Sequence, residues 1–432
     1  MYTDRYGNEV SAASREAFDH YAEGVDRMLA AEIGAEDELT AALAADPDFA
    51  LAKIALARQH HLFARGREAR TLMEESVALA EHATPRERRH VEIIARLIGG
   101  DMVGSLALAK EHAAEHPRDA FALSPACGVF GSIGFSGRPG WEAEHSAFVE
   151  PLAPHYGDDW WFLTVHAFAL LESGDWIRGR EFAERAVEQR PSNAHAAHTL
   201  AHALFEAGAD EDSRAFLEGW IDRSTPEGLM HCHNWWHLAM VRLATGDVDG
   251  AFSAVAGNCM PGTSESPSIN VLTDCVAFLW RAELAGIPRR TDLWEALRDY
   301  YDANFRRPIV FVDAHVGLIH AALGDDERLT ACIEELEALG EGGKLPAGTT
   351  AATLTRAYRA FAAEDWNGAI ERLEPAMDQV VRIGGSRAQR DLQVNTLIAA
   401  YVNAGRDADA RALAGAVEER QPTRPVAGLE RH

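Results

Sequence analysis

Two pairs of histidines at four-residue spacing are the residues of this chain best suited to chemistry. His198 and His202 lie in "HAAHTLAHALFEAG", and His233 and His237 lie in "HCHNWWHLAM". Side chains four apart lie one above the other on a helix, so each pair presents two imidazoles on one face. Imidazole ligates zinc and other divalent ions, and it transfers protons near neutral pH. The two pairs therefore predict a metal-binding or acid–base site.

Other polar residues are placed where they could complete such a site. Asp313 and His315 join the two histidine pairs in the predicted catalytic set. Arg281 and Arg390 are suited to binding a carboxylate or phosphate, and Asp274 or Asp313 to orienting an imidazole. The predicted ligand-binding residues are His166, Asn234, Trp236, Asp274, Arg281, Gln389, Arg390 and Asp391.

Three interpretations of the histidine pairs stay open at this point. The four imidazoles could bind a divalent ion such as zinc, although the HExxH zinc motif is missing and the sequence requires no cofactor. They could instead serve metal-free acid–base chemistry or bind a polar ligand. In the third interpretation they satisfy buried carbonyl groups and stack on tryptophans as part of the core. Isolated histidines such as His90 and His112 are expected to be surface or interhelix residues.

The elements that carry these residues follow a repeated pattern. In "LTVHAFALLESGDWIRGREFAERAVEQRPSN", residues 163–193, a Gly-Asp turn separates two helical stretches with small residues between them, and Pro191 closes the unit. Glycine ends the first helix and proline stops the second. Such turns recur at Gly174, Gly208, Gly246, Gly324 and Gly405, with weaker copies at Gly100 and Glu364. This is the tetratricopeptide pattern of antiparallel helix pairs in about 34 residues.

The pattern predicts an all-α fold, an α-solenoid superhelix of tetratricopeptide-like helix pairs, forming one domain over residues 1–432. Its expected divisions are N-terminal repeats at 1–130, central His/Trp-rich repeats at 131–330 and C-terminal repeats at 331–432. Consecutive first helices are neighbours in a solenoid, so the two histidine pairs should lie in adjacent rows and share one site. The segment "GGSRAQRD" after Ile383 is expected to fold back over the centre, with Gly384-Gly385 as its turn.

Composition excludes several classes of function. The 41 lysines and arginines against 67 acidic residues give a net charge of −26, which argues against a general nucleic-acid or anionic-membrane binder. No window resembles a spanning helix or a secretory signal. The five cysteines are widely spaced without a CxxC pair, which is typical of reduced thiols. The chain is therefore expected to be cytoplasmic, and its oligomeric state is open.

Several segments resemble one group, the tetratricopeptide repeat protein 38 family. They are "HAAHTLAHALFEAGADEDSRAFLEGW", "CHNWWHLAMVRLATGD", "TDCVAFLWRAELAG", "FVDAHVGLIHAALGD" and "GGSRAQRDLQVNTLIAAYVNAGR". The resemblance spans almost the whole chain in order. It implies an all-helical superhelix with a polar pocket in its middle, and it implies no particular reaction.

These observations predict that a small polar or anionic ligand binds in a central His/Asp/Arg/Trp pocket, with a His-based acid–base or metal-dependent reaction as the favoured activity. The alternative is a scaffold that binds a protein or peptide without catalysis. Within "HCHNWWH", helical periodicity expects Trp235 and Leu238 to face the interhelix core. His233, Trp236 and His237 should face the site.

Overall fold

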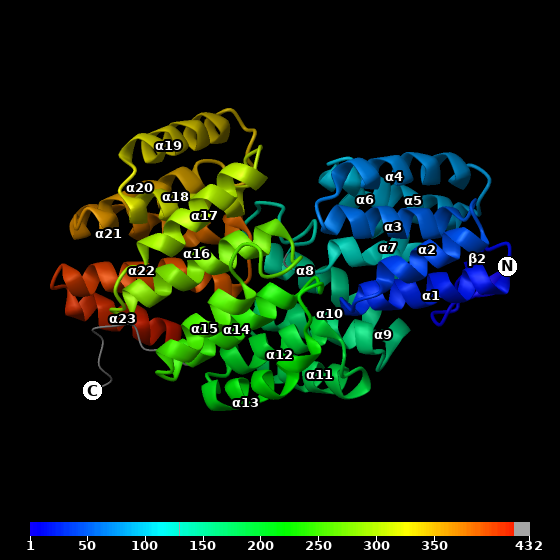
Figure 1. Ribbon diagram of the computed structural model, residues 1–432, viewed down its shortest axis with the longest axis horizontal. Helices are drawn as coiled ribbons and strands as arrows, with labels where there is room; N and C mark the ends of the chain where they lie inside the picture. Colours follow the sequence, from blue (N-terminus) through cyan, green and yellow to red (C-terminus); the bar gives the residue numbers. More distant parts are fainter. Residues whose placement is uncertain (129, 419–432) are drawn as a thin grey trace.

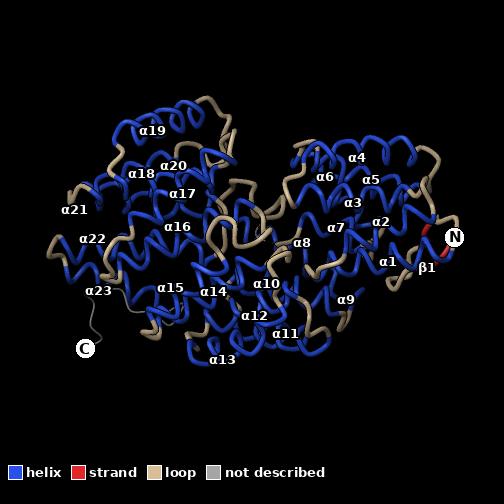
Figure 2. Tube along the Cα trace, viewed as in Figure 1, coloured by secondary structure: helices blue, strands red, loops and turns tan. Residues whose placement is uncertain are grey.

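The computed structural model describes residues 1–128 and 130–418, and its helices pack as antiparallel pairs along the chain (Figure 1). Two short strands, β1 (Tyr2–Thr3) and β2 (Glu9–Val10), pair antiparallel at the N-terminus, with Tyr2 opposite Val10 (Figure 2). They form the sheet found in the described residues. The predicted all-α solenoid of tetratricopeptide-like helix pairs is confirmed.

The helices fall into three successive groups. The N-terminal helices are α1 (Arg15–Ala30), α2 (Ala35–Ala45), α3 (Ala50–Leu62), α4 (Gly66–Ala80), α5 (Pro85–Ile98), α6 (Met102–Glu115), α7 (Ala120–Leu123), α8 (Trp141–Val149) and α9 (Ala153–Tyr156). The central helices are α10 (Trp160–Ser173), α11 (Trp176–Gln189), α12 (Ala194–Glu206), α13 (Asp210–Trp220), α14 (His231–Ala244) and α15 (Val248–Asn258). The C-terminal helices are α16 (Ser268–Leu284), α17 (Thr291–Asn304), α18 (Val310–Leu323), α19 (Asp326–Glu341), α20 (Thr350–Ala362), α21 (Trp366–Leu373), α22 (Arg387–Asn403) and α23 (Asp407–Glu418).

The two residues of each Gly-Asp turn have separate roles. Gly174 adopts φ +96° and ends α10 in the left-handed region, which glycine enters without steric cost. Asp175 then caps α11 by accepting a hydrogen bond from the Arg178 backbone N–H at 3.3 Å. Asp247 and Asp325 cap α15 and α19 in the same way. The recurring dipeptide therefore ends one helix and begins the next.

The first helices of the central and C-terminal repeats lie side by side, with α10, α12, α14, α16, α18 and α20 in contact in that order. Figure 1 shows the N-terminal helices α1–α7 as one lobe and α16–α23 as the other, joined below by α10–α15. This order places the helices with the histidine pairs, α12 and α14, in the middle of the row.

A turn near the C-terminus crosses the row and contacts the N-terminal half. Gly384 and Gly385 have φ +86° and +82°, and a Cβ on either would approach within 2.4 Å of the ring of Phe135 or Phe311. The Trp141 indole N–H donates to the Val381 carbonyl at 3.2 Å. These contacts place the turn before α22 against α8, α18 and Phe135, and α22 itself contacts α16, so "GGSRAQRD" folds back as expected.

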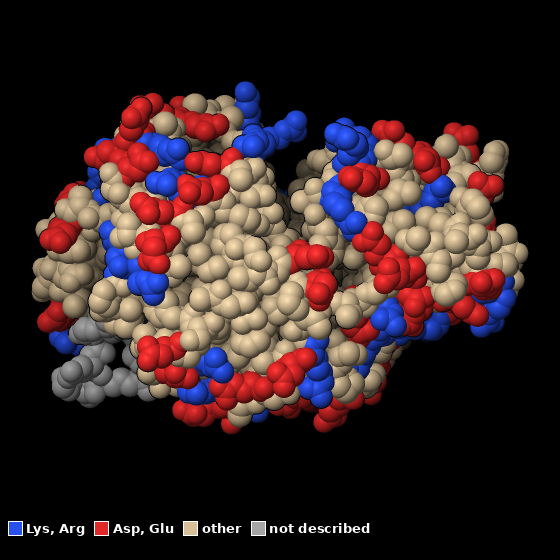
Figure 3. All heavy atoms as spheres, in the orientation of Figure 1, with Lys and Arg blue, Asp and Glu red and all other residues tan. Residues whose placement is uncertain are grey.

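Charged side chains gather on the outer helices, and the centre of the face seen in Figure 3, over α14 and α16, carries few. The same view shows a notch between the two lobes. No helix among the described residues is long and apolar enough to cross a membrane.

Candidate functional site

The two predicted histidine pairs meet in one cluster between α12 and α14. One ligand nitrogen from each of His198, His202, His233 and His237 lies within 4.8 Å of the other three. The Nε2 atoms of His198 and His202 are 2.9 Å apart. Across the two helices, ring centroids are 4.8 Å apart for His198 and His233, and 4.6 Å for His202 and His237. We call these four residues the four-histidine cluster.

Aromatic rings enclose the four-histidine cluster on two sides. Phe168 from α10 meets the rings of His198 and His202 at centroid distances of 6.0 and 5.5 Å. Trp236 stacks on His233 at 5.2 Å with an angle of 15° between the rings, and it meets His237 edge-on at 4.8 Å. These apolar walls remove the cluster from water, which favours neutral imidazole over imidazolium.

Burial and the neighbouring imidazoles disfavour the charged form of His198. The exposed fractions of the four side chains are 9%, 1%, 4% and 6% in chain order. Burial, and then the neighbouring rings of His202, His233 and His237, lower the pKa of His198 well below its usual range. A neutral imidazole keeps a nitrogen lone pair available, which is the form that binds a metal ion.

A carboxylate behind the cluster fixes one of its rings. Asp274 on α16 accepts a hydrogen bond through Oδ2 from His233 Nδ1 at 2.7 Å, and its side chain is 1% exposed. With its hydrogen on Nδ1, His233 presents the lone pair of Nε2. Carboxylate–histidine–metal arrangements use this geometry to orient a ligand and raise its basicity. Asp274 is thus a predicted site residue that reaches the site through His233.

The spacing of the cluster fits a small ion. Zn–N bonds of about 2.0–2.1 Å place the nitrogens of a tetrahedral site roughly 3.4 Å apart. The observed nitrogen separations, from 2.9 Å to at most 4.8 Å, bracket that value. Without a metal, the Nε2 atoms of His198 and His202 share an N–H···N hydrogen bond, which a bound cation would replace. Zinc, copper, nickel and iron all accept imidazole ligands.

A second polar group lies at the beginning of α22, where Arg281, Arg390 and Asp391 were predicted to bind a ligand. Arg281 pairs with Asp391 and also donates to the Ala388 carbonyl at 2.8 Å. Arg390 pairs with Glu142 at 2.8 Å and with Glu172 at 3.5 Å. Both guanidinium groups therefore pair with carboxylates of the chain, and their role as anchors for an anionic ligand stays a prediction.

Sequence reasoning missed two buried glutamates of this second group. Glu172 on α10 and Glu206 on α12 are 3% and 2% exposed. Each stands two residues before the Gly-Asp or equivalent turn of its repeat, at Gly174 and Gly208. An acidic residue at the same place in two consecutive Ala- and Leu-rich helices was the available signal.

Other predicted residues lie away from the four-histidine cluster. His166 packs between the rings of Phe162 and Phe182, at centroid distances of 5.4 and 5.2 Å, because position 166 faces α11. Asp313 faces away from His315 around α18, and burial raises the pKa of Asp313 to about 7, with Glu335 adding to the shift. Both residues lie outside the four-histidine cluster, and the catalytic role of Asp313 and the ligand role of His166 stay predictions.

Three further predicted residues serve the backbone. The amide of Asn234 donates to the Ala194 carbonyl at 3.4 Å, which ties α14 to the start of α12. Gln389 completes the capping box of α22 with Ser386. His315 donates from Nδ1 to the Phe311 carbonyl at 2.7 Å, and its Nε2 is buried without a partner in the described part of the chain. Of the three, His315 alone keeps a nitrogen lone pair for a ligand.

The opening of α14 divides differently from the prediction at one tryptophan. Trp236 is 2% exposed and contacts His233 and His237, as expected. Trp235 packs beside Leu238 but is only half-buried, so it is not the deep core residue that periodicity indicated. The reason is that the helix pair α12–α13 covers Leu238 fully and leaves one edge of Trp235 open.

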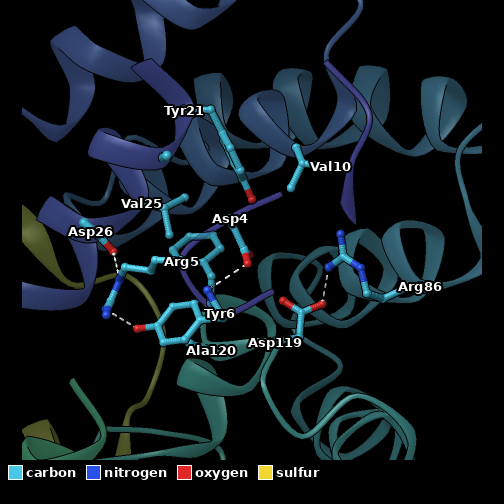
Figure 4. A pocket seen from close by; sticks show the side chains of 12 residues that line it. Asp4, Arg5, Tyr6, Val10, Tyr21, Val25, Asp26, Arg86, Asp119 and Ala120 are labelled. Carbon is cyan, nitrogen blue, oxygen red and sulfur yellow. Dashed lines mark hydrogen bonds and ion pairs between the residues drawn. The ribbon is translucent and has the colours of Figure 1, made fainter. Parts of the chain in front are cut away.

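Two hollows of the described chain lie elsewhere. One, of about 100 Å³, lies between the N-terminal hairpin, α1, α5 and α7, where Tyr21 and Asp4 point toward Asp119 and Arg86 (Figure 4). The other, of about 450 Å³, is an aromatic cleft between the ends of α16, α20 and α22, beside Trp280, Phe361 and Trp366. Neither is lined by the four-histidine cluster, which is buried and is suited to an ion.

Comparison with known proteins agrees with the repeat reading. Residues 170–225, which include α12 and His198 and His202, match the tetratricopeptide repeat model. Among solved structures, the human IFIT1 dimer with PPP-AAAA is similar over 95% of this chain and 92% of that chain, at 13% identity and a TM-score of 0.45. Yeast Tom70 is similar over 94% of this chain and 93% of that chain, at 10% identity and a TM-score of 0.43. Residues 170–225 of the chain are thus a tetratricopeptide repeat segment within the helical-repeat fold.

Proposed function

We propose that this chain is a tetratricopeptide repeat protein built around a transition-metal site, in which the four-histidine cluster binds one divalent first-row ion such as zinc. The observation that carries the proposal is the approach of four buried imidazole nitrogens within 4.8 Å of one another. The resemblance to the tetratricopeptide repeat protein 38 family belongs to the same proposal, since the segments that carry it include both histidine pairs.

The proposed ion joins two consecutive repeats. His198 and His202 come from α12, and His233 and His237 from α14. Structural zinc sites are filled by four side chains, whereas catalytic zinc sites keep one position open for water or substrate. Four histidines supply the closed set, so the ion would fasten α12 to α14. A reaction at the metal would need one of the four imidazoles to leave that position free.

Metal titration tests this proposal. We expect the metal-free protein to bind about one zinc per chain, and cobalt(II) to give the absorption spectrum of a nitrogen-ligated ion. Zinc at 100 times its Kd should raise the free energy of unfolding by about 2.7 kcal/mol. The double variant His202→Ala/His237→Ala should lose both effects, because two ligands are removed.

The matched control is His82→Ala/His155→Ala, which removes two exposed histidines of the N-terminal half and should bind zinc as the wild type does. Equal zinc binding by both double variants, or none by the wild type, would contradict the proposal. In the latter case a peptide-binding scaffold without metal becomes the better account. Four single His→Ala variants separate a closed site, which needs every imidazole, from an open site that tolerates the loss of one.

A further inference from the structure

Seven charged side chains from five helices form a second polar group, which we call the α22 ion network. The carboxyl groups are those of Glu142 on α8, Glu172 on α10, Glu206 on α12 and Asp391 on α22. The guanidinium groups are those of Arg281 on α16 and of Arg387 and Arg390 on α22. Four carboxyl groups thus face three guanidinium groups in a largely buried place, which leaves one carboxyl group without a full counter-charge.

The hydrogen bonds of the network single out Glu206. Glu172 accepts the backbone N–H of Arg387 at 3.1 and 3.2 Å, at the N-terminus of α22, where a negative charge is stabilised. Glu142 and Asp391 have close guanidinium partners in Arg390 and Arg281. Glu206 has the loosest pairing, with Arg387 Nε at 3.5 Å from its Oε2.

Glu206 is deeply buried as well as loosely paired. The side chain of Glu206 is 3% exposed, whereas that of Arg387 is 27% exposed and so shares its charge with water. Burial, with Glu172 and Asp391 adding to it against Arg387 and Arg390, raises the pKa of Glu206 to about 8. An unpaired carboxylate in such a place is costly, and taking up a proton removes the cost.

The position of Glu206 connects the network to the four-histidine cluster. Glu206 follows His202 by four residues and His198 by eight, so all three lie on one stripe of α12. Side chains four apart have Cβ atoms about 5–6 Å from each other. A divalent ion at the cluster would therefore stand close enough to favour the ionised form of Glu206.

We propose that Glu206 is the acid–base residue of the four-histidine site, holding a proton in the metal-free protein and releasing it when a divalent ion binds. The proposal rests on the metal site proposed above. In the step, the O–H bond of Glu206 breaks, its electron pair stays on the carboxylate oxygen, and the proton passes to the solvent buffer. The ion and Arg387 then balance the new carboxylate.

Every helix packed around Glu206 contributes charges that bear on this step. Glu172 acts on it from α10, and Arg387, Arg390 and Asp391 act on it from α22. On the other side of α12, Arg180 of α11 pairs with Glu184 and Asp212. Asp210 begins α13 four residues beyond Glu206. The ion is the added positive charge that changes this balance.

Proton release on zinc binding tests the proposal. Zinc is titrated into the metal-free protein at pH 7 in two buffers of different ionisation enthalpy, and the difference in heat gives the protons released per zinc. We expect about one proton for the wild type and close to none for Glu206→Gln, because neutral imidazoles release none on binding. The wild-type value should fall towards zero above pH 8, where Glu206 is already ionised.

Glu172→Gln is the matched control, since it removes the carboxylate at the same place of the preceding repeat and should leave the release at about one proton. Glutamine keeps the shape of the protonated acid, and thermal unfolding checks that each variant is folded. Equal release by the wild type and Glu206→Gln, or loss in Glu172→Gln instead, would overturn the assignment while the metal site stands. Absence of zinc binding in every protein would overturn both.

Discussion

Two places in this molecule bring buried histidines together, and they differ in what stands between the rings. In the N-terminal half, Asp119 lies between His90 and His112, and accepts from both at 2.9 Å while also pairing with Arg86 at 2.6 Å. In the four-histidine cluster, imidazole nitrogens face one another directly, as His198 and His202 do at 2.9 Å.

The difference assigns opposite roles to the same residue type. Where the Asp119 carboxylate lies between the rings, it accepts from both imidazoles and links α5, α6 and the beginning of α7. Where imidazole nitrogens face one another, as between His198 and His202, the four rings are set out as ligands for one positive ion. The first arrangement is a structural brace, which we call the Asp119 brace, and the second is a ligand set.

Removal of the central carboxylate of the Asp119 brace should have the largest effect on stability. Asp119→Ala leaves Arg86 and two histidines buried without their partner, and breaking a buried ion pair in this way costs about 3–5 kcal/mol. Urea unfolding, monitored by amide exchange in α5 and α6, measures this loss in the free energy of unfolding. Zinc binding should be unchanged. A variant that lost zinc and kept its stability would reverse the two assignments.

Asp274→Asn tests the four-histidine cluster in the same way that Asp119→Ala tests the Asp119 brace. Asp274 holds His233 from behind the cluster, so the variant should keep the fold and weaken zinc binding about 10–100-fold, as loss of such an outer partner does. Competition with a chelator of known affinity measures the change. The matched control is Asp313→Asn, which changes a carboxyl group of α18 on the helix face turned away from His315. It should leave zinc affinity unaltered. Equal affinities for all three proteins would show that His233 needs no positioning.

Part of this arrangement follows from the sequence, and the reasons for the rest are physical. The Gly-Asp turns determine the helix pairs because each residue acts locally, so the solenoid and the adjacency of α12 and α14 could be predicted. The four-residue spacing of His198 and His202, and of His233 and His237, likewise predicted that the two pairs share one site.

Contacts between residues far apart in the chain could not be predicted in the same way. Asp119 converts His90 and His112 from the expected surface or interhelix residues into a buried brace, and no local pattern links the three. The pairing of Arg281 with Asp391, 110 residues later, depends on how α22 crosses the row of first helices. Glu206 was overlooked because one acidic residue near a helix end is ordinary on a solvated face.

Mild acid should destabilise the four-histidine cluster at a higher pH than the Asp119 brace. This is the smallest of the expected effects on stability, and it compares the two groups directly. The pKa of His198 is lowered in the folded metal-free protein, chiefly by burial and then by its neighbouring imidazoles. Below about pH 6.5, the usual pKa of histidine, the unfolded chain therefore binds more protons than the folded one, and stability near the cluster falls.

At Asp119, burial opposes ionisation but His90, His112 and Arg86 outweigh it, so the pKa of Asp119 is held well below its usual range. Its contribution is complete above about pH 4 and is lost only as the pH falls further. Amide exchange of metal-free protein between pH 7 and 5 should thus show α12 and α14 opening more readily while the Asp119 contribution to α5 and α6 persists. Simultaneous opening of both groups in that window would mean that the Asp119 brace and the four-histidine cluster are one kind of structure.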